Sequence, residues 1–551
     1  MTEQREARRS PWLMLTVLCV GQFMTLLDTT IVNIAIPDMV DGLRASLDQV
    51  LWFVNAYMIV FAALQMLAGR LGDRYGPQRM FAAGLVVFTA ASAACGMAQS
   101  PTQMIVTRVI QGIGAAVMMP QTLTLLTAVF PAERRGAAFG IWSAVAGLAA
   151  VAGPTLGGVL VDGLGWRWIF YINVPLGVLA VLATFVFVPD IRLGRKARLD
   201  VPGVLLSTAG LFLISFALIE GQRYDWGTIT SFIGIPLLGA VGVLLLVLFV
   251  LLQRSGQARQ PLLPFALFRI RTSAVSGVLG AALMFGSVGV LLPLTIYVQS
   301  ALGLSAVQAG LAIAPAPLVT LFVAPLTGKL LARFGGRVLV CLGFLAFAAG
   351  IALMAALAGP DSSRWVLLPG LLVFGVGMGL AFGPVSTLAV RNVPPALLGA
   401  ASGVFTTLRQ VGTVLGAAVI GAMLQARLAH ELVSESARRA AELPAQLRPG
   451  FEEGFHQAAD KGIEVGTRGT DSMQGLLTDV PERLRGQVGG LAGEVFGHSL
   501  TSAVQAGLLL AAGVLAAAAL LALLLPGRDL AAGGGGTAAP ETASLEQPVE
   551  G

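Results

Sequence analysis

Charge is scarce in this 551-residue chain. Asp, Glu, Lys and Arg together make up 12% of the residues, whereas hydrophobic residues make up 56%, and the mean hydropathy is +0.81. A soluble protein of this length needs far more charge to cover its surface. The composition therefore excludes a soluble globular protein and predicts an all-α, polytopic membrane protein.

Cysteine and histidine are also rare, with three of each. The cysteines stand alone in separate apolar runs, at Cys19, Cys95 and Cys341. Such isolation excludes a disulfide framework and the spacing of a cysteine metal site, so we expect them to be packing residues. The histidines all fall within residues 427–500, at His430, His456 and His498, far apart in sequence. We expect solvated histidines there and no metal.

Lysine is nearly absent, and the net charge of +6 comes from arginines scattered between apolar runs. A nucleic-acid-binding surface would need these charges in one patch. Their scatter instead favours short loops that meet anionic lipid headgroups. We therefore expect membrane lipids, and not nucleic acid, around the basic residues.

Long apolar runs are abundant. About 20 apolar residues cross a bilayer, and the first run lacks the cleavage site of a signal peptide. This length predicts fourteen spans, at residues 12–36, 49–68, 80–98, 103–126, 136–160, 166–188, 201–220, 228–252, 273–298, 306–328, 337–358, 365–389, 399–425 and 501–525.

Arginine and lysine predict the orientation. With the N-terminus inside, the inner segments hold twenty-one basic residues and the short outer loops hold four. Positive residues favour the cytoplasmic side, so we expect both termini there. Residues 427–500 then form one long outer loop, whose first part has helical spacing and extends the thirteenth span. The tail after Pro526 is small and polar, which predicts disorder.

Motifs of enzymes are missing. The chain has no HExxH, no GxSxG, no phosphate-binding GxxxxGK[ST], and no histidine within any predicted span. These absences weigh against a membrane enzyme. They also weigh against an ATP-driven pump, unless a separate subunit supplies the nucleotide site.

The stretch LLDTTIVNIAIP places Asp28 deep in the first span, about 24 Å along the helix at about 1.5 Å per residue. Because removal from water favours the protonated form of a carboxyl group, we hypothesise that Asp28 alternates between holding a proton and facing substrate, including a lipophilic cation. The alternative is a structural role, in which Asp28 hydrogen-bonds Thr29, Thr30 or Asn33 in an irregular turn.

Two arginines also lie deep in predicted spans. Arg108 begins RVIQGIGAA in span four, and an arginine in hydrocarbon costs several kcal/mol unless it is paired. Near Asp28, it would favour the carboxylate and release the proton. Arg409 lies in GVFTTLRQVGTVLG of span thirteen. It either holds the helices together or lines the transport path, and the sequence leaves both open.

The connection after span two reads GRLGDRYGPQRMF, with Gly69, Asp73 and Arg74. It resembles the signature loop of the major facilitator superfamily, and GKLLARFGGR after span ten is a degenerate echo with Ala332 in place of the acid. The echo implies two related halves. In the family this loop latches the cytoplasmic side, a role that the resemblance assigns to Gly69, Asp73 and Arg74.

Further motifs narrow the resemblance. RVIQGIGAA resembles the motif whose arginine, here Arg108, takes part in proton coupling. GLAAVAGPTLGGVL in span five resembles the GPxxGG signature of drug/proton antiporters, carried here by Gly153, Pro154, Gly157 and Gly158. With LDTTIVNIAIP, GWRWIFYINVPLG and GVFTTLRQVGTVLG, the chain resembles the fourteen-helix drug/proton antiporter family, which contains multidrug and antibiotic exporters.

The resemblance implies a major-facilitator fold of two six-helix bundles with two extra central helices. The expected parts are a first bundle at 12–189, two added helices and linkers at 190–272, helices of the second bundle at 273–427, an extracytoplasmic loop at 428–500, the last span at 501–525 and the tail at 526–551. The extra helices would be accessory to alternating access.

The implied function is proton-coupled efflux of small amphipathic, drug-like or antibiotic compounds across the inner (cytoplasmic) membrane, with no cofactor because the proton gradient supplies the energy. The alternative is a dedicated exporter of one endogenous metabolite, siderophore or lipid that meets an envelope partner through residues 428–500.

Overall fold

The computed structural model describes residues 10–45, 47–191, 200–221, 224, 226–230, 233–255, 265–304, 306–360, 362–363, 365–394, 397–461 and 482–526. The basic linker expected at 192–199, the middle of the outer loop at 462–481 and most of the tail lie outside these residues. The described chain is almost entirely helical, as the apolar composition predicts.

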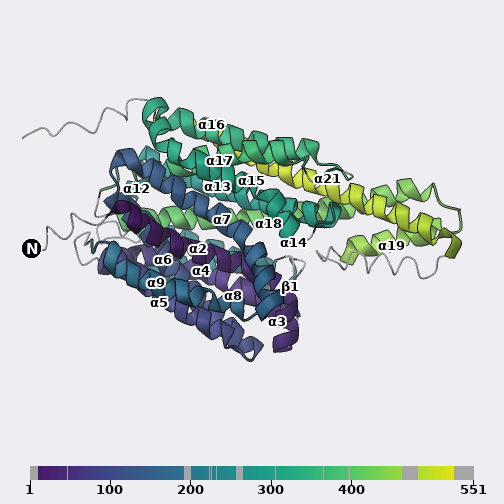
Figure 1. Ribbon diagram of the computed structural model, residues 1–551, viewed down its shortest axis with the longest axis horizontal. Coiled ribbons are helices and arrows are strands. Elements are labelled where there is room, and N and C mark those ends of the chain that lie inside the picture. Colours follow the sequence, from purple (N-terminus) through teal and green to yellow (C-terminus); the bar gives the residue numbers. More distant parts are fainter. Residues whose placement is uncertain are drawn as a thin grey trace, which may run out of the picture.

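The first half forms one bundle (Figure 1). Its helices are α2 (Pro11–Ile34), α3 (Ile36–Leu43), α4 (Leu47–Tyr75), α5 (Pro77–Gly96), α6 (Pro101–Val129), α7 (Ala132–Leu164), α8 (Trp168–Tyr171) and α9 (Asn173–Phe187). Two added helices follow, α10 (Val201–Glu220) and α11 (Ile235–Ser255), and the short α12 (Ala266–Arg269) leads into the second half.

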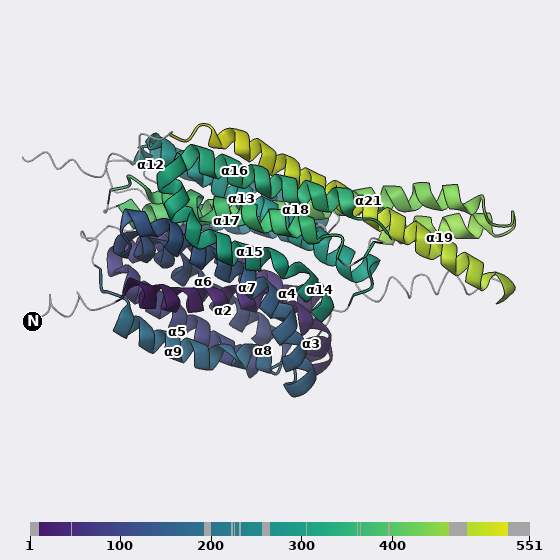
Figure 2. The same ribbon diagram turned by 45° about the horizontal axis from the view of Figure 1, so that its top comes forward.

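The second half lies beside the first, as Figure 2 shows from another angle. Its elements are α13 (Arg271–Ile296), the π-helical η3 (Tyr297–Ala301), α14 (Ala306–Ile313), α15 (Pro315–Val323), the 3₁₀-helical η4 (Ala324–Leu326), α16 (Thr327–Leu357), α17 (Leu368–Val390), α18 (Leu398–Ala440), α19 (Arg448–Lys461) and α21 (Glu482–Ala522). Two six-helix bundles and two added helices make this the major-facilitator architecture.

Twelve helices in the described part of the chain are long and apolar enough to cross a bilayer. One of these candidates, Gln308–Leu357, is a 50-residue stretch that runs through α14, α15, η4 and α16 and covers most of two predicted spans. Gly335, with φ of +79°, turns the chain between these two spans within α16. The predicted fifth span lies in the 33-residue α7, so each of the fourteen predicted segments overlaps one or more described helices.

Two predicted spans differ from the helices in the structure. The segment at 306–328 breaks at Ala314 and Ala324, because Pro315 and Pro325 cannot donate the backbone hydrogen bonds that a continuous helix needs. The predicted span at 228–252 begins later, at Ile235. Its first residues instead form an antiparallel ribbon of β1 (Thr228–Thr230) and β2 (Ile233–Gly234), in which Thr228 pairs with Gly234.

The loop and its echo have the same backbone shape. Gly76 lies between α4 and α5 with φ of +93°, and Gly335 occupies the matching place in the echo with φ of +79°. Only glycine adopts such a conformation without strain. This shared turn supports the relationship between the two halves that the sequence echo predicts.

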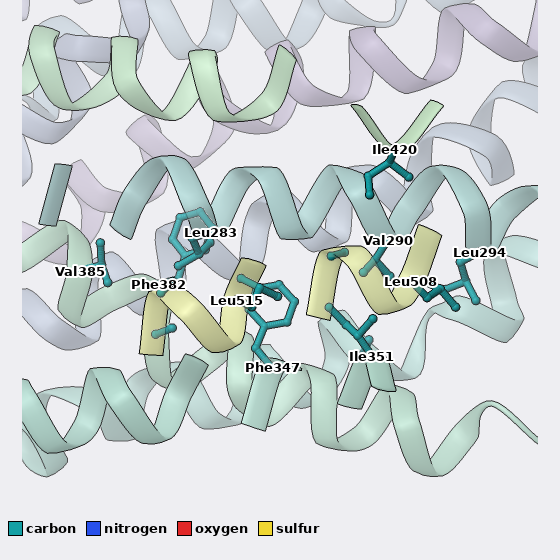
Figure 3. Packing of buried hydrophobic residues seen from close by; sticks show 14 of the residues in the cluster. Leu283, Val290, Leu294, Phe347, Ile351, Phe382, Val385, Ile420, Leu508 and Leu515 are labelled. Carbon is teal, nitrogen blue, oxygen red and sulfur yellow. The ribbon is translucent and has the colours of Figure 1, made fainter. Parts of the chain in front are cut away.

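The helices pack through small residues and interlocking apolar side chains. Figure 3 shows the core of the second half, where leucine, valine, isoleucine and phenylalanine side chains from α13, α16, α17, α18 and α21 fill the space between helices. On α11, by contrast, Val243, Leu244 and Leu251 are exposed. An exposed apolar face of this length suits contact with lipid tails.

α18 and α21 are too long to end at a membrane surface. α18 has 43 residues and α21 has 41, or about 60 Å each at about 1.5 Å per residue, against about 30 Å of hydrocarbon. Their far ends and α19 project from the bundle (Figure 1). We call this projection, residues 427–461 and 482–500, the stalk, and the opposite end, where α4 meets α5, the basic end.

The three histidines lie on different helices of the stalk, His430 on α18, His456 on α19 and His498 on α21. Within the described ranges, no three potential metal ligands gather in one place. The stalk helices are instead joined by polar contacts such as Arg439 to Glu494 at 3.0 Å, and Ser502, next to the stalk on α21, donates to Glu431 over 3.0 Å.

Candidate functional site

Asp28 lies inside the first bundle, fully buried in the regular helix α2. The Arg108 guanidinium donates to its Oδ2 over 2.5 Å, and the Gln111 amide donates to its Oδ1 over 2.9 Å. Both partners come from α6. The carboxylate is therefore held by the neighbouring helix, and α2 has no irregular turn at this point.

Arg108 is also fully buried and contacts three helices. Its Nε donates to the Phe53 carbonyl of α4 over 2.7 Å, and its NH1 donates to Gln111 over 2.7 Å. The guanidinium carbon lies 4.5 Å from the centre of the Tyr57 ring. The ion pair is thus enclosed by α2, α4 and α6.

Gln111 and Tyr57 are site residues that the sequence analysis missed. Gln111 follows Arg108 by three residues, the spacing that puts two side chains on one helix face. This spacing could have identified it. Tyr57 donates its hydroxyl to the Thr25 carbonyl of α2 over 3.3 Å. Nothing in the sequence around Tyr57 signals this position, which depends on how α4 packs against α2.

The GPxxGG stretch packs α7 on α2 near Asp28. A Cβ on Gly153 would lie 2.6 Å from the Cβ of Thr30 and 3.3 Å from the backbone nitrogen of Ile31, so only glycine allows this approach. Gly157 is buried and Gly158 is half-buried. The side chain of Pro154 lies outside the described residues. Gly153 therefore packs against α2 two to three residues after the buried acid.

At the basic end, α4 of the first bundle meets α18 of the second. A Cβ on Gly69 would lie 2.6 Å from the Gly399 carbonyl oxygen and 2.9 Å from the Gly403 Cα. Thr124 of α6 also donates to Ser402 of α18 over 2.9 Å. These contacts hold the two bundles together at the basic end.

Asp73 faces the first turn of α18, where the backbone N–H groups of Gly399 and Ala400 attract its charge. Neither carboxylate oxygen has a hydrogen bond of normal geometry within the described residues. Its ion pair, at 3.5 Å, is with Arg70. Arg74, which the resemblance placed in the latch, is exposed and lies over the Tyr75 ring at 5.3 Å.

Arg409 lies where the two bundles meet, and it takes no part in the pair of Asp28 with Arg108. Its guanidinium carbon is 5.2 Å from the ring centre of Trp142 on α7, 4.7 Å from that of Phe382 on α17 and 5.8 Å from that of Phe405 on its own helix. Its NH2 contacts the Met284 sulfur at 3.6 Å. Within the described residues it has no carboxylate partner.

A second buried acid was also missed. Glu220, at the end of α10, is fully buried and accepts a hydrogen bond from the Asn55 amide of α4 over 2.6 Å. Trp52 and Phe216 add a ring contact of 5.7 Å between the same two helices. Glu220 ends the apolar run of α10. An acid at the end of such a run suggests the membrane surface, and not a buried position. Glu220 fixes the added helix to the first bundle.

Comparison with known proteins supports this architecture. The model of the Major Facilitator Superfamily matches residues 18–417. The tetracenomycin C resistance and export protein of Streptomyces glaucescens is 34% identical over 420 residues, covering 76% of this chain and 76% of that protein. The multidrug resistance protein Stp of Mycobacterium tuberculosis is 35% identical over 417 residues, with 76% of each chain covered.

Solved structures show the same fold. The structure of the proton:xylose symporter XylE superposes with a TM-score of 0.54, covering 75% of this chain and 88% of that chain at 16% sequence identity. At this identity the likeness concerns the fold alone. With the family model and both relatives in agreement, the chain belongs to the major facilitator superfamily, whose members are transporters and not enzymes.

Proposed function

We propose that the protein is a proton-coupled exporter of small amphipathic compounds, including drugs or antibiotics, that works by alternating access in the cytoplasmic membrane. The observation that carries the proposal is the fully buried contact of Asp28 with Arg108 and Gln111. A buried acid within a membrane transporter is a natural carrier of protons. Export as the direction is supported by relatives named for resistance and export.

In this proposal the basic end faces the cytoplasm, as the distribution of arginine predicts. The described conformation is then closed toward the cytoplasm by the contacts of Gly69 with Gly399 and of Thr124 with Ser402. Protonation of Asp28 removes its negative charge, so Arg108 loses its ionic partner. The pair then favours a different arrangement of α2 and α6, and α7, packed on α2 at Gly153, moves with it.

The proton gradient supplies enough free energy for this cycle. A proton that crosses about 100 mV and about one pH unit releases roughly 3.7 kcal/mol, which sustains a substrate gradient of a few hundred-fold. If one monovalent cation leaves for each proton, the charges cancel and about tenfold remains. The charge of the substrate therefore decides how much of the membrane potential is used.

The proposal is tested in proteoliposomes with an imposed pH gradient. Purified protein should accumulate a fluorescent amphiphile against its concentration gradient only when the pH gradient is present, and a protonophore should stop this accumulation. A screen of toxic amphiphiles in an efflux-deficient bacterium, with and without the protonophore, would supply the substrate. Transport that continues at the same rate after the gradient collapses would contradict proton coupling.

A latch variant tests the closed basic end. Gly69→Leu places a side chain against the backbone of α18, and overpacking of this kind costs about 1–3 kcal/mol. The equilibrium should shift by roughly tenfold to a hundredfold toward an open basic end. Spin labels in place of Tyr75 and Phe334, both exposed at this end, should move apart in a pulsed electron resonance measurement.

Gly163→Leu is the matched control for the latch variant. It inserts the same side chain into α7, at a position where an added Cβ would meet no side chain and no other helix within 4 Å in the described structure. The distance between the two labels should stay at its wild-type value. An unchanged distance in Gly69→Leu would remove the α4–α18 contact from the gating step.

The stalk favours a second candidate, a dedicated exporter of one compound that docks an envelope partner. Helices that project this far from the membrane supply a surface for such a partner, and one relative is named for a single antibiotic. Replacing residues 428–498 by a short flexible linker distinguishes the candidates. A self-sufficient exporter should keep its efflux within about twofold in cells and in proteoliposomes. A partner-dependent one should lose it in cells only.

A further inference from the structure

The acids inside the described bundles each have a polar or charged partner, and Glu220 accepts a hydrogen bond from Asn55. Asp28 is paired with Arg108, and Asp73 with Arg70. Arg409 is half-buried between the bundles, and the described part of the chain places no acid within ion-pair distance of it. Three aromatic rings and a thioether stand around it instead. Ring faces stabilise a guanidinium, but they do not neutralise its charge.

A second hydrogen-bond donor without an acceptor in the described residues, the indole N–H of Trp142, lies beside Arg409. Trp142 is 3% exposed, and its indole Nε1 has no hydrogen-bond partner among the described residues. Buried donors of this kind are costly and nearly always find an acceptor. A guanidinium and an indole N–H in neighbouring side chains, both without an oxygen acceptor among the residues that the structure describes, indicate that the acceptor comes from a bound molecule.

The place of the cluster suits a transported molecule. Arg409 lies about 17 Å along α18 and Trp142 about 15 Å along α7, both counted from the basic end at about 1.5 Å per residue. This depth is near the middle of a bilayer of about 30 Å. Trp142 belongs to the first bundle, whereas Arg409, Phe382 and Met284 belong to the second. Binding sites of transporters built from repeats lie at such an interface.

From this cluster we infer the substrate class: an anionic compound, with a carboxylate or acidic hydroxyl group on a flat aromatic body. The guanidinium supplies charge and paired donors for the oxygens, the Trp142 N–H supplies a further donor, and the rings supply stacking faces. This inference rests on the proposed export function and names the substrate that function acts on.

The same contacts disfavour a lipophilic cation. The carboxylate of Asp28, which the sequence offered as a partner for such a cation, is fully buried and already holds Arg108 and Gln111. A cation beside Trp142 would meet the charge of Arg409, with no acid of the described residues in contact with that arginine. An anion would meet a charge that lacks a partner.

The test compares three probes with one ring system and different charge: 1-pyrenebutyrate, 1-pyrenebutanol and 1-pyrenebutylamine. Their binding to the full-length protein in nanodiscs is measured by equilibrium dialysis, without a proton gradient and with empty nanodiscs subtracted. The wild type should bind the butyrate about tenfold or more tightly than the butylamine, with the butanol between them, because a hydrogen-bonded charge is worth at least this factor.

Substitutions show which side chains cause the preference for the anionic probe. Arg409→Gln should lower the butyrate-to-butylamine affinity ratio by about tenfold to a hundredfold, and Trp142→Phe, which keeps a ring but removes the N–H, should lower it by a few-fold. Arg427→Gln is the matched control: Arg427 lies on the same helix but in the stalk, paired with Glu431 at 2.9 Å. It should leave the ratio at the wild-type value.

The wild-type result stands without any variant, so a variant that fails to fold does not weaken the test. Tighter binding of the butylamine, equal binding of the two charged probes, or no binding of either would overturn the inference. Proton coupling is measured separately, as gradient-driven transport in proteoliposomes. Gradient-driven transport together with a preference for cations would leave the proposed function standing and remove only the anionic class.

Discussion

Asp28→Asn is expected to abolish proton-driven export while leaving exchange of substrate across the membrane. Asparagine has nearly the same shape as aspartate and can still contact Arg108 and Gln111, but it cannot gain or lose a proton. Without that step the roughly 3.7 kcal/mol of the proton gradient is not transmitted, so the substrate gradient should fall from a few hundred-fold to about one.

The measurement uses proteoliposomes in two modes at matched protein content. Gradient-driven transport should be lost, whereas counterflow of labelled substrate against unlabelled substrate should remain within a few-fold of the wild type. Asp38→Asn is the matched control, because Asp38 is an exposed acid in the short helix after α2. Wild-type accumulation by Asp28→Asn would exclude this carboxyl group from coupling.

Arg108→Met should have the largest effect on stability. The substitution leaves the Asp28 carboxylate buried without its charge partner, and breaking one side of a buried ion pair typically costs about 3–5 kcal/mol. The double variant Asp28→Asn/Arg108→Met has no such charge and should recover most of the loss. The free energy of unfolding is measured in mixed micelles by tryptophan fluorescence.

Arg79→Met serves as the control for Arg108→Met. Arg79 forms an ion pair with Asp190 at 3.2 Å, but its side chain is 54% exposed. Exposed pairs contribute about 0–1 kcal/mol, so the control should remain close to the wild type. A single Arg108→Met variant as stable as this control would show that the pair carries little energy. A double variant as unstable as Arg108→Met would assign the loss to packing.

The membrane spans and the buried acid could be predicted from the sequence, because both depend on the free energy of moving side chains from water into the membrane. Each run is long enough to cross a bilayer, and the charge of Asp28 demands a partner at that depth. Arg108 was a natural candidate for the same reason. These predictions need only composition and position along a helix.

The details that escaped prediction depend on packing between distant segments. Arg70, not Arg74, pairs with Asp73 because of the direction in which each side chain leaves α4. The aromatic surroundings of Arg409 come from α7 and α17 as well as its own helix. No local pattern around Arg409 reveals them, so its two roles stayed open. The breaks at Pro315 and Pro325, by contrast, follow a local rule that the hydropathy count ignored.

The stalk has a mechanical consequence. Because α18 and α21 continue from the second bundle without interruption, the stalk moves with that bundle as one rigid body. A tilt of about 10° would sweep a tip roughly 30 Å beyond the membrane through about 5 Å. A molecule bound to α19 would therefore be displaced once in each transport cycle. A fluorophore at position 456, in place of His456, would move farther than one within the bundle, so it would report the tilt with a larger amplitude.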